Sequence, residues 1–412
     1  MSQHADVHSD MEPVETHLAE VLAAIQPLAP VLLSLADAEG AVLAEDVTAG
    51  TPLPSFDNSA MDGYAVQARD LEGASDQAPV TLPVTAVIAA GDTRSHEVTP
   101  GRCVRIMTGA LLPPGADTVV PVEWTDGGTD RAQFRRPVAA GDAVRRRGDD
   151  VSKGDVLLAA GTRVGSVQLA LLAASGVGSA LVRPRPRVAV ISTGNELAEP
   201  GTPIIPGRIW DSNSYMLAAA AREAGAVAHR HRISDDTAGV LPAIEAQLPQ
   251  ADLLVTTGGV SMGGEHDVVK AALAGLGTVT FRKVAMQPGM PQGFGVVGGT
   301  PIFTLPGNPV SAFVSFELFV RPALRALQAL PTQRSSPARA ILTHAVRSPN
   351  GRRSYLRGIL DAQEGTVTPM TGQASHQLGS LAQANALIIV PEQVVSMDAG
   401  DAADVVPLGG CG

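Results

Sequence analysis

The sequence predicts a multidomain protein of the α/β plus β class: a parallel three-layer α/β domain, irregular N-terminal β and helical domains, and a small C-terminal β-barrel-like domain. Three observations lead to this prediction. The chain has 412 residues, which is more than a single hydrophobic core usually supports. It contains 43 Gly and 31 Pro, which favours turns and β structure over a helical bundle. In its middle part, an apolar strand, a glycine-containing loop and a helix follow one another repeatedly.

The domain boundaries are predicted from changes in this pattern. An extended R-P-R-P-R segment at residues 183–187 separates an N-terminal part, with short strands and many turns, from the α/β part. After Pro331 the pattern becomes β again. We therefore expect a disordered tail at 1–12, an N-terminal and linker region of two intertwined subdomains at 13–182 with its β-rich subdomain at roughly 53–145, the α/β domain at 183–330, and the β domain at 331–412.

In the N-terminal part, apolar side chains recur at helical spacing over residues 13–26, and Pro27 and Pro30 end this predicted helix. Residues 166–175 predict a second short helix. Between the two, apolar runs bounded by Gly and Pro predict strands at 80–88, 103–107 and 118–122.

The α/β part is predicted from its apolar strands, which lie at 188–191, 253–256 and 301–305. Asn213 and Ser214 are suited to cap a helix that runs through Arg222, and a further helix is expected at 311–320. Strands that alternate with helices predict a parallel, doubly wound sheet, and such sheets bind ligands at the carboxyl ends of their strands.

The C-terminal part is predicted to contain strands at 338–342, 355–360 and 386–390. They favour a small β domain that is either a closed barrel or a sandwich.

Composition and charge argue against several function classes. The net charge is −11, so a surface that binds nucleic acid is not expected. No apolar run reaches the length of a membrane span, so we expect no membrane association. The two cysteines, Cys103 and Cys411, form neither a CxxC motif nor a disulfide framework, which fits a reducing cytoplasm.

Residues 52–66 (P-L-P-S-F-D-N-S-A-M-D-G-Y-A-V) are the most informative stretch of the chain. The prolines and the D-N and D-G pairs predict a loop. This loop carries the carboxylates of Asp57 and Asp62 and the amide of Asn58. Because so many acceptors are costly unless they meet water, a metal or a ligand, the loop is a candidate site.

A second candidate is the glycine-rich segment 256–267 (T-T-G-G-V-S-M-G-G-E-H-D), which follows a strand and precedes a helix. It is either a phosphate-binding loop or a simple turn; three such loops at one sheet edge favour a ligand site. Four carboxylates follow strands or begin helices of the same domain. Each alone could be a helix cap, but as a group they favour a hard divalent cation. They are Glu196, Asp235, Asp236 and Asp267.

Residues 145–150 (R-R-R-G-D-D) form the densest basic run of an acidic chain. Arginine forks bind oxyanions, but the spacing alone favours a solvated hairpin tip neutralised by Asp149 and Asp150. The histidines do not favour zinc, because His229 and His231 have no third ligand near them. A hydrolase triad at residues 372–376 (G-Q-A-S-H) is rejected, because adjacent residues do not readily form a nucleophile–base pair.

Several separated segments together resemble one family, the molybdopterin molybdenumtransferases of the MoeA and gephyrin E-domain group. They follow the order of that family and cover nearly the whole chain from residue 13. The segments are 54–65 (P-S-F-D-N-S-A-M-D-G-Y-A), 105–110 (R-I-M-T-G-A), 115–120 (G-A-D-T-V-V), 145–150, 192–197 (S-T-G-N-E-L), 257–261 (T-G-G-V-S), 305–311 (L-P-G-N-P-V-S) and 372–376.

The resemblance implies a molybdopterin-binding α/β domain, similar to that of the adenylyltransferase partner, within an elongated four-part protein that forms a homodimer. The implied reaction inserts molybdate into adenylylated molybdopterin, releases AMP and uses Mg²⁺, and so completes the molybdenum cofactor. The implied protein partners are the molybdopterin adenylyltransferase and the apoenzymes that accept the cofactor.

The resemblance also implies roles for single residues, matched position by position. Asp62 and Thr108 would reach the cleft of the other subunit. Residues implied for catalysis are Asp62, Thr108, Asp150, Glu196, Asp235 and Lys283. Residues implied for substrate binding are Arg145, Gly258, Gly259, Ser261, Pro306, Gly307, Asn308, Arg357 and Ser375, the last two for molybdate. Residues implied for metal binding are Glu196 and Asp267.

Two departures from the family pattern keep alternatives open. The common run K-P-G-K-P reads Q-P-G-M-P at residues 287–291, so two basic positions are lost while Lys283 remains. The loop that leads to Asp267 is one residue longer than usual. A second hypothesis is therefore a catalytically weak paralogue that carries or scaffolds a pterin phosphate. A third is the preceding adenylyltransferase, although most of this chain lies outside the α/β domain.

Overall fold

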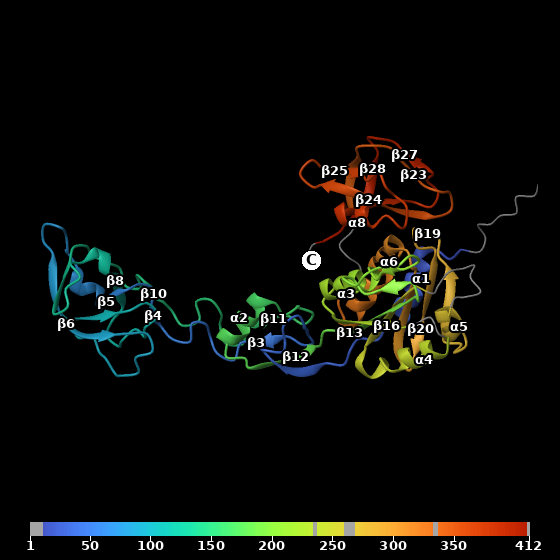
Figure 1. Cartoon of the computed structure of the whole chain (residues 1–412). Helices are drawn as coiled ribbons and strands as arrows, with labels where there is room; N and C mark the ends of the chain where they lie inside the picture. Colours follow the sequence, from blue (N-terminus) through green and yellow to red (C-terminus); the bar gives the residue numbers. More distant parts are fainter. Residues whose placement is uncertain (1–10, 234–236, 259–267, 333–336, 410–412) are drawn as a thin grey trace, which may run out of the picture. The chain divides into compact units, whose positions relative to one another are not determined.

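The computed structural model describes residues 11–233, 237–258, 268–332 and 337–409 (Figure 1). The chain divides into two compact units. The larger unit contains residues 1–31, 40–42 and 182–412, and the smaller contains residues 32–39 and 43–181. None of the helices in the described ranges combines the length and apolar character that crossing a bilayer requires.

A six-stranded sheet forms the centre of the larger unit. In spatial order its strands are β16 (Val227–Ile233), β13 (Arg187–Thr193), β17 (Leu253–Thr257), β21 (Thr300–Leu305), β20 (Pro291–Val297) and β18 (Val279–Lys283). The first four run parallel, which confirms the three predicted strands and their parallel pairing. The fifth strand, β20, runs antiparallel to both of its neighbours, β21 and β18. This edge differs from the prediction because Gly298 and Gly299, both with positive φ, close a two-residue hairpin between β20 and β21.

Helices cover both faces of this sheet, which confirms the predicted three layers. On β13, Val188 and Val190 belong to one core, and Ala189 and Ile191 to the other, because successive side chains of a strand point to opposite faces. The first core is covered by α1 (Val14–Ala24), α3 (Asn213–Glu223), α6 (Pro309–Ser315) and α7 (Arg321–Leu327), and the second by α4 (Thr237–Glu245) and α5 (Val268–Ala274). A π-helical turn at Phe316–Val320 joins α6 to α7 and extends the helix expected at 311–320.

The C-terminal strands form a closed barrel, so the barrel alternative is confirmed over the sandwich. In order around it, the strands are β24 (Arg353–Asp361), β25 (Thr366–Pro369), β22 (Ala338–Leu342), β28 (Ala402–Pro407) and β26 (Ala386–Val390). Pairing between β24 and β26 closes the ring. The short strand β19 (Met286–Gln287) pairs in parallel with β24 and connects the barrel to the α/β layers.

The smaller unit contains the N-terminal strands predicted from the apolar runs. They are confirmed as β6 (Val80–Ile88), β7 (Cys103–Ile106) and β8 (Thr118–Pro121), in a five-stranded sheet with β5 (Gly63–Val66) and β9 (Arg131–Phe134). The second predicted helix is α2 (Ser166–Ala174). Gly63 must be glycine, because a Cβ there would lie 2.0 Å from the Val120 carbonyl oxygen on β8.

The remaining elements are short. They are β1 (Val31–Ser34), β2 (Val42–Leu43), β3 (Val47–Thr48), β4 (Asn58–Ser59), β10 (Val144–Arg145), β11 (Val156–Leu158), β12 (Ser179–Arg183), β14 (Leu197–Ala198), β15 (Ile209–Trp210), β23 (Val346–Arg347), β27 (Ser396–Met397), α8 (Leu378–Gln383), and 3₁₀ helices at Ala68–Leu71, Val122–Trp124 and Leu248–Gln250.

Candidate active site

A pocket of about 100 Å³ lies at the carboxyl ends of the parallel strands in the larger unit. Thr193 ends β13, Thr257 ends β17, and Asn213 begins α3; all three line the pocket. This is the edge at which a doubly wound sheet is expected to bind its ligand. The predicted site residues that line the pocket are Glu196, Gly258 and Gly307.

The backbone at Gly258 requires glycine. Its φ is +89°, and a Cβ there would lie 2.9 Å from the carbonyl oxygen of Thr193. Any side chain would therefore strain the turn and push the end of β17 away from the end of β13. The glycine allows two strand ends to approach closely at the floor of the pocket.

The Asn213 side chain connects the loops around the pocket. Its Nδ2 donates to the carbonyl oxygen of Gly307 at 2.7 Å and to Thr257 Oγ1 at 2.9 Å. Thr257 Oγ1 donates in turn to the carbonyl oxygen of Pro306 at 3.4 Å. The prediction that Asn213 caps a helix with its side chain is therefore wrong: the side chain bridges the loops that follow β17 and β21.

Two polar atoms of the lining have no hydrogen-bond partner among the described residues. They are Asn213 Oδ1 and Thr193 Oγ1, and the Thr193 residue is only 4% exposed. A buried polar atom without a partner costs about 1–3 kcal/mol. A ligand that donates N–H or O–H groups to this wall would remove that cost, so the pocket is chemically suited to a polar ligand.

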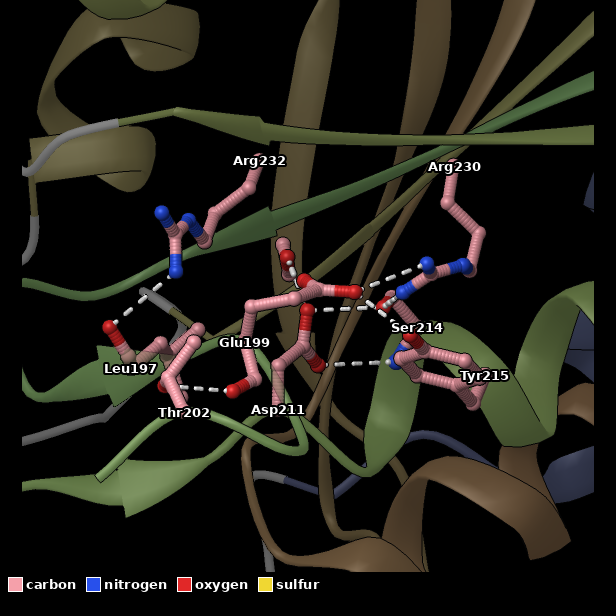
Figure 2. Close-up of polar contacts among 9 residues, drawn as sticks. Leu197, Glu199, Thr202, Asp211, Ser214, Tyr215, Arg230 and Arg232 are labelled. Atoms are coloured by element: carbon pink, nitrogen blue, oxygen red, sulfur yellow. Dashed lines mark hydrogen bonds and ion pairs between the residues drawn. The ribbon is translucent and has the colours of Figure 1, made fainter. Parts of the chain in front are cut away.

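A buried carboxylate, that of Asp211, holds this wall together (Figure 2). It is 2% exposed and accepts hydrogen bonds from Ser192 Oγ at 2.6 Å, from Ser214 Oγ at 2.7 Å, and from the Ser214 backbone N–H at 3.1 Å. The carboxylate of Asp211 therefore caps α3 by accepting a hydrogen bond from a backbone N–H at its start. It also ties the end of β13 to that helix. The side chain of Ser214, which the sequence predicts to cap this helix, donates to Asp211 instead.

A second group of polar side chains is linked to Asp211 through the hydroxyl of Ser214 (Figure 2). Arg230 donates to Ser214 Oγ at 3.1 Å and to Glu199 Oε1 at 3.2 Å, and its guanidinium lies 3.4 Å from the centre of the Tyr215 ring. The Tyr215 hydroxyl also donates to Glu199 Oε1, at 2.5 Å. These donors, first Tyr215 and then Arg230, lower the pKa of Glu199.

Glu196 is an exposed carboxylate of the pocket lining. Its side chain folds back over Gly194, where a Cβ would lie 2.5 Å from the carboxylate oxygen. Within the ranges that the structure describes, no three His, Cys, Asp or Glu side chains gather into a metal site. Asp235, Asp236 and Asp267, the other predicted members of the carboxylate group, lie outside the described residues, as do Gly259 and Ser261.

The barrel places Arg357 and Ser375 near the same edge. Arg357 is fully buried, and its Nη2 donates to the carbonyl oxygens of Gly372 at 2.6 Å and Ala374 at 3.2 Å. Its Nε and Nη1 have no partner among the described residues. Burial lowers the pKa of Arg357. The Ser375 carbonyl oxygen accepts a hydrogen bond from the Val310 N–H in α6, next to Pro309, which lines the pocket.

In the smaller unit, the structure brings Asp62 and Thr108 together. Asp62 Oδ1 accepts hydrogen bonds from the Thr108 backbone N–H at 2.7 Å and from Thr108 Oγ1 at 2.6 Å. These bonds lower the pKa of Asp62, and both residues are exposed. In the single chain, Asp62 therefore presents to solvent an ionised carboxylate that Thr108 holds in place.

The acidic loop and the arginine run also meet in this unit. Arg146 Nη1 donates to Asp57 Oδ2 at 2.8 Å, and the Arg147 backbone N–H donates to Asp57 Oδ1 at 2.8 Å. The expectation that Asp149 and Asp150 neutralise the run is wrong for Arg146, whose guanidinium pairs with Asp57. Two other predicted site residues of the run, Arg145 and Asp150, are exposed.

Three predicted residues of the α/β domain do not line the pocket. Lys283 ends β18, while Pro306 and Asn308 lie between β21 and α6, and none of the three is part of the lining. A second, larger pocket of about 270 Å³ lies against β13 and β16, and none of the predicted site residues lines it. Asp211 and Thr193 are not predicted as site residues from the sequence, because only the fold brings Ser192, Asp211 and the start of α3 together.

Three family models match consecutive parts of the chain. The MoeA N-terminal region (domain I and II) matches residues 12–176, a probable molybdopterin binding domain matches 189–326, and the MoeA C-terminal region (domain IV) matches 339–408. The pocket described above lies within the second of these matches.

Full-length relatives agree with this assignment. The chain is 49% identical over 397 residues to molybdopterin molybdenumtransferase 2 of Mycobacterium tuberculosis, covering 95% of this chain and 98% of the relative. It is 39% identical over 382 residues to molybdopterin molybdenumtransferase of Bacillus subtilis, covering 91% of this chain and 89% of the relative. A crystal structure of the molybdopterin biosynthesis MoeA protein from Pyrococcus horikoshii OT3 matches with a TM-score of 0.73 and 29% identity, covering 96% and 99% of the two chains. The chain therefore belongs to the molybdopterin molybdenumtransferase family, the transferases of molybdenum cofactor biosynthesis.

Proposed function

We propose that this chain inserts molybdate into adenylylated molybdopterin, with release of AMP, in an Mg²⁺-dependent reaction that completes the molybdenum cofactor. The observation that carries the proposal is the pocket at the carboxyl edge of the sheet, in the part of the chain that matches a molybdopterin binding domain. The proposed substrate offers N–H and O–H donors, and the pocket wall holds two acceptor atoms without partners, Asn213 Oδ1 and Thr193 Oγ1. A donor-rich ligand therefore fits this wall.

Molybdate would be bound through the C-terminal barrel. An oxyanion needs charged donors in a dry environment, and Arg357 is buried with Nε and Nη1 free of described partners. Its remaining hydrogen bonds go to the loop of Gly372 and Ala374, which continues to Ser375. Arg357 would orient molybdate, and the Ser375 loop would position it relative to α6.

The donor set of the pocket fits Mg²⁺ in a limited way. Glu196 is an exposed carboxylate of the lining, and Mg²⁺ is typically held by one or two carboxylates together with substrate phosphates and water. Glu196 would therefore hold the ion, with Asp267 as the second expected ligand. When bound, the ion offsets phosphate charge as the phosphoanhydride to AMP breaks. The chain's own contribution is to bind and orient the substrate and to exclude water from it.

The residues of the smaller unit would act across a homodimer. Asp62 and Thr108 form an exposed, hydrogen-bonded pair, and Arg145 and Asp150 are exposed as well. Exposed polar groups of this kind would complete the cleft of the partner subunit. Light scattering at micromolar concentration is expected to give twice the mass of the 42.2 kDa chain. A mass of one chain would remove the basis for assigning Asp62 to the reaction.

A turnover assay tests the proposal. Purified protein is supplied with adenylylated molybdopterin, molybdate and Mg²⁺, and both AMP and active cofactor are measured. Stoichiometric AMP and cofactor are expected, with no product when molybdate is omitted. Tight pterin binding without turnover would instead favour the carrier paralogue, which the loss of basic residues at Gln287 and Met290 motivates. ATP-dependent adenylylation of molybdopterin would favour the adenylyltransferase.

In the proposed setting the protein acts in the cytoplasm. It would receive its substrate from a molybdopterin adenylyltransferase and pass the product to apoenzymes that use the cofactor. Mixing the protein with each class of partner and measuring cofactor transfer in the presence of a scavenger for free cofactor tests this order.

A further inference from the structure

The pocket has an unbalanced charge. Its lining contains the carboxylates of Glu196 and Asp211, and none of its described lining residues is Lys or Arg. Among these described lining residues, a phosphorylated substrate would face negative charge without a compensating basic side chain. Phosphate oxygens often pair with Arg or Lys donors, so a basic group just outside the lining would balance this charge.

Arg232 lies next to the pocket in the sheet. β16 and β13 run parallel, and Arg232 is the register partner of Ser192 while Ile233 is that of Thr193. Both Ser192 and Thr193 line the pocket. Side chains of register partners on neighbouring strands point to the same face, so Arg232 shares the face of Ser192, whose hydroxyl donates to Asp211.

The Arg232 side chain extends towards the lining (Figure 2). Its Nη1 donates to the carbonyl oxygen of Leu197, another lining residue, over a long 3.4 Å. This is the only side-chain hydrogen bond of Arg232 within the described part of the chain, and the residue is exposed. Most of the five guanidinium donors therefore have no hydrogen-bond partner among the described residues.

Arg230, two residues earlier on the same strand, is in a contrasting position. It is hydrogen-bonded to Ser214 and Glu199, and it stacks on the ring of Tyr215. The guanidinium of Arg230 is therefore engaged in contacts that stabilise the wall of the pocket. The two arginines share a strand face, and with respect to the described residues Arg232 is the one of the two that keeps most of its donors for a ligand.

We propose that Arg232 is the phosphate-binding cation of this pocket and pairs with phosphate-ester oxygens of the substrate. This inference rests on the proposed function, because it assumes a phosphorylated ligand in the same pocket. The guanidinium would leave the Leu197 carbonyl, rotate about its side-chain bonds and present two parallel donors to the phosphate. It would supply at the mouth of the pocket the positive charge that the lining lacks.

Binding measurements on the full-length protein test this role. The variants are Arg232→Gln, Arg232→Lys and, as a matched control, Arg339→Gln, which removes the same charge from an exposed barrel residue 73% accessible at its side chain. The probes are molybdopterin and AMP, measured by calorimetry at low and physiological salt, with adenosine as a probe without phosphate. Arg232→Gln is expected to weaken one or both phosphorylated probes about 10- to 100-fold and to leave any adenosine affinity unchanged. Arg232→Lys is expected to recover part of the loss.

The pattern over the two probes identifies the phosphate. A loss confined to molybdopterin assigns Arg232 to the pterin phosphate, and a loss confined to AMP assigns it to the nucleotide phosphate. Equal affinities of Arg232→Gln and wild type for both probes would overturn the proposal, as would an equal loss in Arg339→Gln or no binding of either probe to wild type. A loss accompanied by a fall in melting temperature like that of Arg230→Gln would also overturn it, because it would place Arg232 in the supporting wall.

The outcome is separable from that of the proposed function. If wild type binds the probes through Arg232 but does not form cofactor in the turnover assay, the insertase proposal fails while the phosphate site stands. If turnover is normal in Arg232→Gln at low substrate concentration, the phosphate site fails while the insertase proposal stands.

Discussion

The carbonyl oxygen of Ser375 accepts a hydrogen bond of 3.1 Å from the backbone N–H of Val310. Val310 lies in the first turn of α6, directly after Pro309 of the pocket lining. The same barrel loop carries the two carbonyl oxygens that bind Arg357. This contact joins a buried guanidinium of the barrel to the edge of the sheet at which the pocket lies, and the proposed molybdate site depends on it.

Arg357→Met is expected to impair molybdate use without unfolding the barrel. The change removes a buried charge with two unpartnered donors and two hydrogen bonds to backbone. These opposing effects should keep the change in unfolding free energy below about 2 kcal/mol, while kcat/KM for molybdate falls about 10- to 100-fold. Urea unfolding and a molybdate titration of turnover measure the two quantities.

Arg357→Lys serves as the control for charge alone. Lysine keeps the positive charge but not the fork of donors, so only part of the molybdate dependence should return. An unchanged molybdate KM in Arg357→Met would remove Arg357 from the oxyanion site.

Asp62→Asn is expected to reduce turnover about 100-fold, the scale of loss when a reacting group is misplaced. Asp62 is exposed and its carboxylate is held by Thr108, so the melting temperature should not move. Thr108→Val removes the hydroxyl donor and keeps the backbone one, and it should cause a smaller loss. If Asp62→Asn instead lowers the melting temperature by several degrees with normal turnover, Asp62 supports the fold and not the reaction.

Gly258→Ala and Gly307→Ala form a matched pair within one pocket. At Gly258 the φ of +89° and a Cβ 2.9 Å from the Thr193 carbonyl oxygen predict strain of about 1–3 kcal/mol and weaker pterin binding. At Gly307 the added Cβ would meet the Gly258 Cα at 3.7 Å, an ordinary contact, so a milder effect is expected. Thermal unfolding and pterin affinity check the order, and a larger cost at Gly307 would contradict the pocket geometry.

His17 predicts a pH dependence of stability. It is 3% exposed and packs edge-on against Phe319 at 4.8 Å. Burial, and secondly the charge of Arg282, lower its pKa from 6.5 to about 4. Glu12 lies 3.4 Å away, but Arg282 binds that carboxylate at 2.9 Å, so we expect His17 to stay neutral.

The direction in which the unfolding free energy changes with pH follows from proton uptake by the unfolded chain. Between pH 6.5 and about 4, His17 is protonated in the unfolded chain and neutral in the folded one, so the unfolding free energy falls as pH falls. The fall attributable to His17 is about 3 kcal/mol and ends below the folded pKa. Denaturant unfolding of wild type and His17→Leu from pH 7 to 4 measures it. Identical slopes for the two proteins would show that His17 does not titrate in this way.

The sequence predicts the central strands well because their apolar runs are continuous and are followed by glycine. β13, β17 and β21 are of this kind. The antiparallel edge is harder to predict, because β20 carries Gly293 and Gly295 in a strand interior, where glycine has no side chain to mark a pattern. Close packing against neighbouring segments requires glycine at both positions. A Cβ on Gly293 would lie 1.9 Å from Thr304 Oγ1, and one on Gly295 would lie 2.1 Å from the carbonyl oxygen of Thr278.

The site could be predicted only in part for a similar reason. Glu196, Gly258 and Gly307 belong to local motifs, and each lines the pocket. Asn213 has the chemistry of a helix cap and lies at the start of a helix, so local rules assign it to capping. Its true partners, Thr257 and Gly307, are distant in the chain, and only the parallel order of the strands brings them within reach.

A crystal structure of the protein with adenylylated molybdopterin would locate the substrate site. The ligand is expected at the carboxyl edge of β13, β17 and β21, against Asn213 and the Gly258 and Gly307 loops. Ligand in the larger pocket beside His229 and Gln250, with the edge of the sheet empty, would contradict this placement.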